Sequence, residues 1–289
     1  MSAMFVALAA LFWGLSAAIG GVLIASGWQP SVIAFYRGAI GLLLVGSWSL
    51  LRPGRSGFGN RRLWFWSALA GVGIAGNFGF YYLSISRGSV AVASTLMYCA
   101  PVFVYLVSFA LKLERPTPFK WGAIAAVMPG LVMLTRVYEV GGEGVELFGV
   151  IAALLSGLSY GLFIFGLKYA SYHGTPPGIL AIAFTVLVSL LIIPSRGSEI
   201  LAVPGSQSRL LFLILGILGG GVSFILYVLG LRSTPPGVAS ILAMVEPVTA
   251  SFAAVVLLDE GLIAVQLLGM VLILTSVTGL SLSSNREGR

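Results

Sequence analysis

The sequence has few charged residues and almost none of the residues that bind metals or form disulfides. Only 9% of its 289 residues are charged, against about 25% in soluble domains, so it has too little polar surface to coat a water-soluble globule. It has one cysteine, Cys99, and one histidine, His173, and a single cysteine excludes an internal disulfide. With no H-E-x-x-H motif, phosphate-binding loop or Cys/His cluster, the sequence predicts no enzyme, no catalytic residues, no metal and no cofactor.

Long apolar segments dominate instead. Hydrophobic residues make up 58% of the chain, and a helix needs about 20 mainly apolar residues to cross the bilayer. Barrel strands alternate polar and apolar residues, and stretches such as "GILAIAFTVLVSLLII" do not. The sequence therefore predicts an all-α integral membrane protein with ten transmembrane helices. They are expected at residues 3–26, 30–51, 63–86, 89–112, 118–136, 146–172, 177–195, 208–232, 235–258 and 262–283.

The positions of the basic residues predict the orientation. The net charge is +7, and in bacterial membrane proteins Lys and Arg concentrate on the cytoplasmic side. With a cytoplasmic N-terminus, the outer connections contain only Arg87, Arg136, Arg196 and Arg209. The even number of helices then places the C-terminus in the cytoplasm too. The inner connections and ends would contain Arg52, Arg55, Arg61, Arg62, Lys112, Arg115, Lys120, Lys168, Arg232, Arg286 and Arg289.

Two segments half a chain apart share one pattern. "STLMYCAPVFVYLVSFALKLE", residues 94–114, aligns without gaps with "SILAMVEPVTASFAAVVLLDE", residues 240–260. Pro101 then matches Pro247, and Glu114 matches Glu260. Both segments fall in predicted membrane helices, which indicates an internal duplication.

A second pair of segments fits the same duplication. "LFWGLSA" near the N-terminus resembles "LLSGLSY" at residues 154–160. Each half then holds five helices, and an odd number makes the two halves enter the membrane in opposite directions. The sequence thus predicts two inverted five-helix repeats, residues 1–141 and 142–289, around a central cavity.

These motifs resemble those of the drug/metabolite transporter superfamily. The "P-V…L-x-E" segments, the "W-G-L-S" start and the "V-E-P-V" of the second half are similar to its ten-helix metabolite exporters, which include aromatic amino acid exporters. The resemblance covers almost the whole chain. It implies export of small metabolites by alternating access across the bacterial inner membrane. It also implies that helices 30–51, 118–136, 177–195 and 262–283 support the other six, which surround the cavity.

Pro101 and Pro247 lie about halfway along their predicted helices. Each proline removes one backbone hydrogen bond and frees a carbonyl one turn earlier, and a free carbonyl in lipid needs a partner. We expect both prolines to face the cavity and to act as hinges in gating. A packing kink without a role in transport is the alternative.

Two charged residues lie inside the predicted membrane helices. Glu246 is near the bilayer centre, where an acid costs roughly 2.5–3.5 kcal/mol on insertion scales, so a lipid-facing position is disfavoured. Glu246 either binds a substrate amine or a proton, or is a hydrogen-bonded acid that satisfies the backbone broken at Pro247, and the sequence leaves both open. Arg37 is expected to extend to the outer interface, with a role at the outer gate as the alternative.

The six inner helices would supply aromatic rings and single hydroxyl groups. Such a lining suits a mostly apolar ligand with a few polar groups, so we expect aromatic amino acids and related compounds as substrates. The candidate substrate-binding residues are Trp13, Ser16, Asn77, Tyr81, Tyr82, Tyr98, Ser156, Tyr160, Phe163, Ser223, Tyr227, Met244 and Glu246.

Other functions remain open at this point. A multidrug or quaternary-cation exporter would use Glu246 and aromatic faces to hold a cation, and a channel or membrane scaffold belongs to a different class. The expected partners are a small-molecule substrate and the lipid bilayer, with no nucleic acid. Protons are a candidate coupling ion, and the sequence does not fix the oligomeric state.

The orientation is directly testable. A reporter that is active only in the cytoplasm, fused after Arg289, is expected to be active, because the basic residues favour that side. The same reporter inserted after Arg136, in a predicted outer connection, is expected to be silent. An extracellular C-terminus would overturn the orientation.

Overall fold

The fold comes from a computed structural model that describes residues 2–51, 57–87, 90–141, 146–258 and 261–287. All regular elements in these ranges are helical. Of the residues discussed above, Arg52, Arg55, Glu260 and Arg289 lie outside the described residues.

The described elements follow one another along the chain with short connections. The helices are α1 Ser2–Ala25, α2 Pro30–Leu51, α3 Arg61–Ser86, α4 Val90–Met97, α5 Ala100–Ala110, α6 Pro118–Thr135, α7 Leu147–Ala170, α8 Pro176–Leu191, α9 Gly197–Ala202, α10 Arg209–Gly216, α11 Ser223–Leu231, α12 Pro236–Leu242, α13 Val245–Leu258 and α14 Ala264–Glu287, with short 3₁₀-helices at Val137–Glu139 and Val203–Gly205 and a π-helix, η5, at Ile217–Val222.

Within the described ranges, nine helical stretches are long and apolar enough to cross a membrane. They coincide with nine of the ten predicted helices. The predicted helix 177–195 forms the shorter α8, which ends at Leu191. Pro194 follows closely, and the residue before a proline is disfavoured in a helix, which explains the early end. At 1.5 Å per residue, its 16 residues give about 24 Å, less than the hydrocarbon thickness of about 30 Å.

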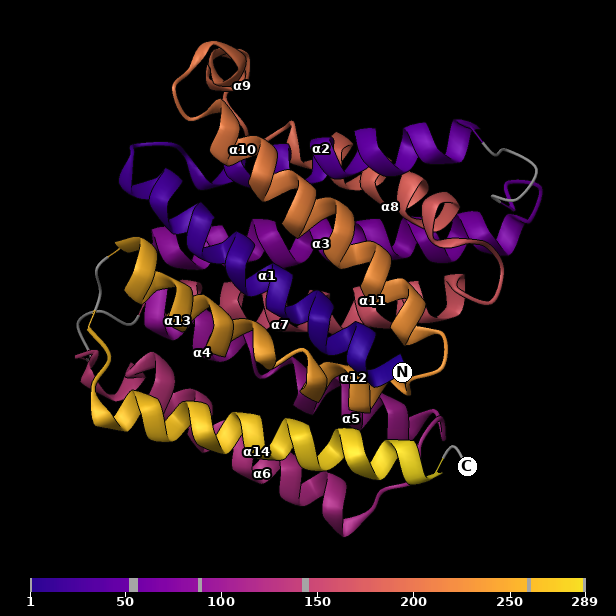
Figure 1. The fold of residues 1–289 in the computed structure, drawn as a ribbon, viewed down its shortest axis with the longest axis vertical. Coiled ribbons are helices and arrows are strands. Elements are labelled where there is room, and N and C mark those ends of the chain that lie inside the picture. The colour runs from indigo at the N-terminus through magenta and orange to yellow at the C-terminus, as the bar shows by residue number, and fades with distance from the viewer. Residues whose placement is uncertain (1, 52–56, 88–89, 142–145, 259–260, 288–289) are drawn as a thin grey trace.

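The helices run alongside one another, and the start of α1 and the end of α14 lie at the same end of the bundle (Figure 1). We call this end the termini side and the opposite end the far side. At one edge α14 packs along α6 (Figure 1), where Gly130 and Gly269 face each other's backbone carbonyl. Side chains at either glycine would separate these two helices, so small residues set the close packing.

Two of the membrane-crossing stretches are interrupted in the middle. Residues 98–99 separate α4 from α5, and residues 243–244 separate α12 from α13. At each break the backbone tightens into bonds that span three residues, from Cys99 N to Leu96 O at 3.2 Å and from Met244 N to Ile241 O at 2.9 Å. In the aligned segments the two breaks fall within one residue of equivalent positions.

Pro101 and Pro247 lie just after these breaks, in the first turn of α5 and α13. The first turn tolerates proline because its N–H groups have no helical partner. Both prolines are buried. Their role as hinges stays a prediction.

A glycine from the opposite half lies against each break. Gly14 of α1 packs on the second-half break, where an added Cβ would lie 2.5 Å from Glu246 O and 2.9 Å from Ala250 N. Gly157 of α7 packs on the first-half break, where an added Cβ would lie 2.9 Å from Met97 O. The glycine shared by "W-G-L-S" and "S-G-L-S" therefore permits the same close approach in both halves.

The substitution Gly14→Ala is expected to lower stability. The methyl group would meet backbone atoms, which cannot move aside without shifting a helix, and such overpacking costs about 1–3 kcal/mol. Gly122→Ala is the control, because nothing lies within 4 Å of its added Cβ. Thermal unfolding of both variants in the same detergent measures the difference. Equal unfolding temperatures would contradict the close approach.

Candidate substrate cavity

A cavity of about 310 Å³ extends from the region of the two breaks toward the far side. Its deep end is lined by Tyr98, Tyr160 and Glu246, near the breaks, and its outer end includes Ile24 and Ile85 at the far ends of α1 and α3. The full lining consists of Ser16, Ala17, Gly20, Gly21, Ile24, Pro30, Ile33, Ala34, Arg37, Asn77, Phe78, Tyr81, Tyr82, Ile85, Val90, Met97, Tyr98, Tyr160, Leu215 and Glu246.

About half of the predicted substrate-binding residues line this cavity. Most of these residues carry a hydroxyl, amide or carboxyl group on an apolar or aromatic wall. Those that line the cavity are Ser16, Asn77, Tyr81, Tyr82, Tyr98, Tyr160 and Glu246, whereas Trp13, Ser156, Phe163, Ser223, Tyr227 and Met244 lie outside its lining. Pro101 and Pro247, which we expected to face the cavity, also lie outside its lining.

Glu246 points into this cavity from the first turn of α13. Its backbone N–H donates to Ala243 O at 2.9 Å, which partners the backbone at the break. Its carboxylate accepts from the Tyr160 hydroxyl at 3.4 Å, so it contacts α7 of the same half. Glu246 is 8% exposed and lines the cavity while it keeps this partner. Both interpretations of Glu246 therefore stay predictions.

Arg37 corrects two expectations from the sequence. Its side chain lines the cavity and does not extend to the interface. The Nε–H donates to Gly219 O at 3.1 Å, and the guanidinium lies 5.1 Å from the centre of the Phe78 ring. Helix α2 therefore contributes to the cavity wall, although the resemblance implied that helix 30–51 only supports from outside.

The π-helix η5 makes room for Arg37. In it, "ILGGGV" places Gly219 against Ser16 and Gly220 against the Arg37 carbonyl, where a Cβ would overlap either neighbour. The Gly219 carbonyl accepts from both Arg37 and the Ser223 hydroxyl, so Ser223 supports the wall and does not line it. An arginine within an apolar helix is itself the signal of a functional site.

A buried polar contact joins the two halves beside the cavity. Asn77 Nδ2 of α3 donates to Ser156 O at 3.1 Å and to Ser156 Oγ at 3.0 Å. The Ser156 hydroxyl donates in return to Asn77 O at 2.8 Å. The predicted residue Ser156 therefore orients Asn77, which lines the cavity.

An aromatic cluster occupies the next turn of the helices toward the termini side. The Trp13 ring lies 4.8 Å from Tyr227 and 5.0 Å from Phe224, centre to centre. Phe163 packs on Trp13 and on Tyr160. These five rings are at most 3% exposed, and Met244 at the second break is fully buried. The predicted residues Trp13, Phe163, Tyr227 and Met244 thus separate the cavity from the termini side.

The charges of the cavity are opposite in sign and few. Arg37 supplies a cation and Glu246 an anion, and four tyrosines supply rings and hydroxyl groups. Within the described residues, no three His, Cys, Asp or Glu side chains come together to hold a metal ion. The arrangement suits binding of a small ligand that carries both charges.

Comparison with known proteins gives one family. The sequence profile of the EamA-like transporter family matches residues 1–136 and 147–282. The "Uncharacterized transporter YwfM" of Bacillus subtilis is 25% identical over 290 residues, 98% of this chain and 95% of that protein. An "Uncharacterized transporter" of Archaeoglobus fulgidus is 30% identical over 68% of this chain and 69% of its own.

Two further similarities are to another transporter sequence and to a solved fold. The "Uncharacterized inner membrane transporter YicL" of Salmonella typhimurium is 26% identical over 72% of this chain and 70% of its own. A solved crystal structure shares the fold, with a TM-score of 0.75 at 18% identity over 100% of this chain and 99% of that one.

The contact between Asn77 and Ser156 predicts a stability effect. Asn77→Ala removes two buried hydrogen bonds donated by the side-chain amide, which together contribute about 1–3 kcal/mol. Thr185→Ala is the control, since that hydroxyl donates within its own helix to Ala181 O. Thermal unfolding in detergent checks this, and an unchanged unfolding temperature for Asn77→Ala would show that the contact does not join the halves.

Proposed function

The chain belongs to the EamA-like transporter family, and we propose that it exports small zwitterions with an apolar side chain, aromatic amino acids foremost, by alternating access. It is a multi-pass membrane transporter, whose partners are a small-molecule substrate and the lipid bilayer. By analogy with the inner-membrane relative, we propose that it lies in the bacterial inner membrane. The excess of Lys and Arg in the expected inner connections supports a cytoplasmic position for both termini.

One observation supports the substrate class above all: Arg37 and Glu246 line the same small cavity. An α-amino acid carries a carboxylate and an ammonium group. The guanidinium of Arg37 suits the carboxylate, because its N–H groups can bind both carboxylate oxygens. The Glu246 carboxylate, with the tyrosine rings around it, suits the ammonium group.

The rest of the cavity suits an apolar side chain. Phe78, Ile33, Met97 and Ala17 contribute apolar surface to the lining, and the tyrosine rings add flat faces. Aromatic rings pack well on such faces in offset or edge-on geometry. An aromatic amino acid would therefore place its ring on this wall while its charged groups reach Arg37 and Glu246.

Several features support alternating access by two inverted repeats. The family profile matches residues 1–136 and 147–282 separately, and each half contributes one interrupted membrane stretch with a glycine of the other half against its break. Counting α8 as the short tenth helix gives five helices per half. In the present arrangement the cavity extends to the far side, and the aromatic cluster around Trp13 separates it from the termini side.

A second candidate is the export of aromatic or quaternary cations. Glu246 and the tyrosine rings favour it, because both attract a cation. Arg37 in the same cavity opposes it, because a cationic ligand would be repelled by the guanidinium. A channel or scaffold is a further alternative, which transport kinetics distinguish.

The proposal predicts saturable transport in proteoliposomes. Radiolabelled aromatic amino acids are expected to enter, to show counterflow against unlabelled substrate, and to be displaced poorly by aromatic quaternary cations. Counterflow distinguishes a carrier from a channel. Repeating the assay with and without a pH gradient determines whether protons are exchanged. Flux without saturation or counterflow would contradict a carrier.

Two variants that each remove one charge from the cavity test which residue binds which group of the substrate. A charged hydrogen bond contributes about 1.5–3 kcal/mol, so Arg37→Gln and Glu246→Gln are each expected to weaken amino-acid binding about 10- to 150-fold. Arg37→Gln should bind an aromatic amine that lacks the carboxylate as well as it binds the amino acid. Arg209→Gln, an exposed charge outside the cavity, is the control. If both cavity variants transport normally, the proposed recognition is wrong.

A further inference from the structure

A buried carboxylate joins the two halves at the termini side, opposite the cavity mouth. Glu114 follows α5, where Lys112 adopts a left-handed conformation with φ 55°. The Leu113 N–H donates to Ser108 O at 2.8 Å, which closes the end of α5 and reverses the chain. This turn brings the Glu114 side chain to the start of α12.

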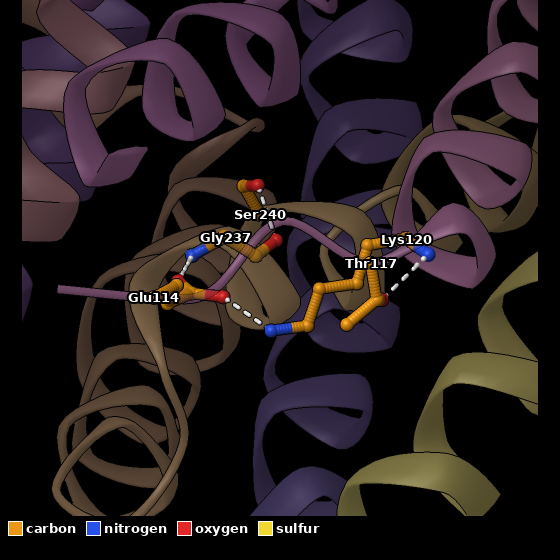
Figure 2. Close-up of polar contacts among 5 residues, drawn as sticks. All are labelled: Glu114, Thr117, Lys120, Gly237 and Ser240. Atoms are coloured by element: carbon orange, nitrogen blue, oxygen red, sulfur yellow. Dashed lines mark hydrogen bonds and ion pairs between the residues drawn. The ribbon is translucent and has the colours of Figure 1, made fainter. Parts of the chain in front are cut away.

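The carboxylate of Glu114 has two partners, which Figure 2 shows. Its Oε1 accepts from the Gly237 N–H at 2.6 Å, and its Oε2 lies 3.2 Å from Lys120 Nζ. The first N–H groups of a helix have no partner within the helix, so Glu114 caps α12 with a full negative charge. The side chains of Glu114 and Lys120 are only 2% and 10% exposed.

No space remains at this contact. A Cβ added at Gly237 would lie 2.8 Å from Tyr105 Cε2 and 2.9 Å from Glu114 Oε1. Ser240, one turn further along α12, is fully buried, and its hydroxyl donates to Gly237 O at 2.7 Å. The start of α12 is therefore sealed against α5.

The two partners of Glu114 belong to different halves. Lys120, near the start of α6, belongs to the first half with Glu114, whereas Gly237 belongs to the second. Lys168 of α7 donates to Leu231 O, Arg232 O and Thr234 O at 2.8–3.0 Å, which ties the chain just before α12 to the second half. Moving α12 with the second half would thus break the Glu114–Gly237 bond and keep the Glu114–Lys120 pair.

Because the two partners of Glu114 lie in different halves, separating the halves at this contact costs less free energy. Removing one partner of a buried ion pair leaves an uncompensated charge and is strongly destabilising. Because Lys120 stays with Glu114, the carboxylate keeps its counter-charge when Gly237 leaves. Gly237 is also nine residues before Glu246, about 14 Å along the helix, so a movement of α12 reaches the break and the cavity.

We propose that Glu114 and Gly237 form the gate of the termini side, held closed by this charged hydrogen bond between the halves and opened by its release. The inference rests on the proposed alternating access. It assigns a role in the transport cycle to a glutamate outside the cavity and to a glycine that has no side chain.

The test measures how fast cysteines on either side of the gate react with a thiol reagent, in the absence of substrate. In a chain whose native cysteine is replaced, Cys99→Ser, one reporter is Ser240→Cys behind the gate and a second is Ser16→Cys in the cavity. A membrane-impermeant maleimide is applied to vesicles of each orientation. With the gate closed, the reporter at 240 is expected to label slowly from either side, and the reporter at 16 to label from the far side.

Two independent changes should open the gate. Glu114→Gln replaces the charged hydrogen bond to Gly237 by a neutral one and removes the counter-charge of Lys120, so labelling at 240 from the termini side should rise while labelling at 16 from the far side falls. Gly237→Ala should do the same, because its methyl group displaces α5 while Glu114 and Lys120 keep their charges. Glu139→Gln, an exposed carboxylate paired with Arg136, and Gly122→Ala are the matched controls.

The outcomes separate the gate from the proposed substrate. Unchanged labelling in both gate variants, with amino-acid transport intact in the parent chain, overturns the gate and leaves the function standing. A rise in labelling in a chain that transports no amino acid supports the gate and overturns the substrate class. If Glu114→Gln does not fold, Gly237→Ala alone decides the result.

Discussion

A backbone N–H or C=O group that faces hydrocarbon without a partner costs several kcal/mol, because no water is present to replace the lost bond. The two interrupted stretches, at residues 98–99 and 243–244, depart from the regular helical hydrogen-bond pattern in the middle of the bundle. They are stable there because short-range backbone bonds tighten both breaks, and because Gly14 and Gly157 bring helices of the opposite half against them. The breaks therefore define where the two halves meet.

The cavity is a consequence of the same constraint. Glu246 lies in the first turn of α13, just after the break, and lines the cavity together with Arg37 and four tyrosines. The other end of the same stretch, at Gly237, is held by Glu114 from the first half. One interrupted stretch thus connects the proposed binding site to the proposed gate. We regard the break between α12 and α13 as the point where movement at one end is converted into a change at the other.

Much of the fold could be predicted from the sequence, because hydropathy directly reflects the lipid environment. The membrane helices were located within a few residues, and only 177–195 was overestimated, since Pro194 ends α8 early. The cavity residues were predicted less well. Ser16 and Trp13 lie one turn apart on the same apolar helix, and nothing in the local sequence separates their roles. Ser16 lines the cavity, whereas Trp13 packs in the aromatic cluster. Arg37 was assigned to the interface because a long side chain near a helix end can extend outward as readily as inward.

The sequence by itself determined that the chain lies in a membrane and that two of its long apolar segments carry a proline near the middle, because composition and spacing are properties of the chain alone. Only the tertiary structure decided which side of each helix faces the cavity, that Arg37 and Glu246 share it, and that Glu114 caps a helix 123 residues away. These contacts join segments from different halves, and their formation depends on how closely glycines let the helices pack, which no local pattern records.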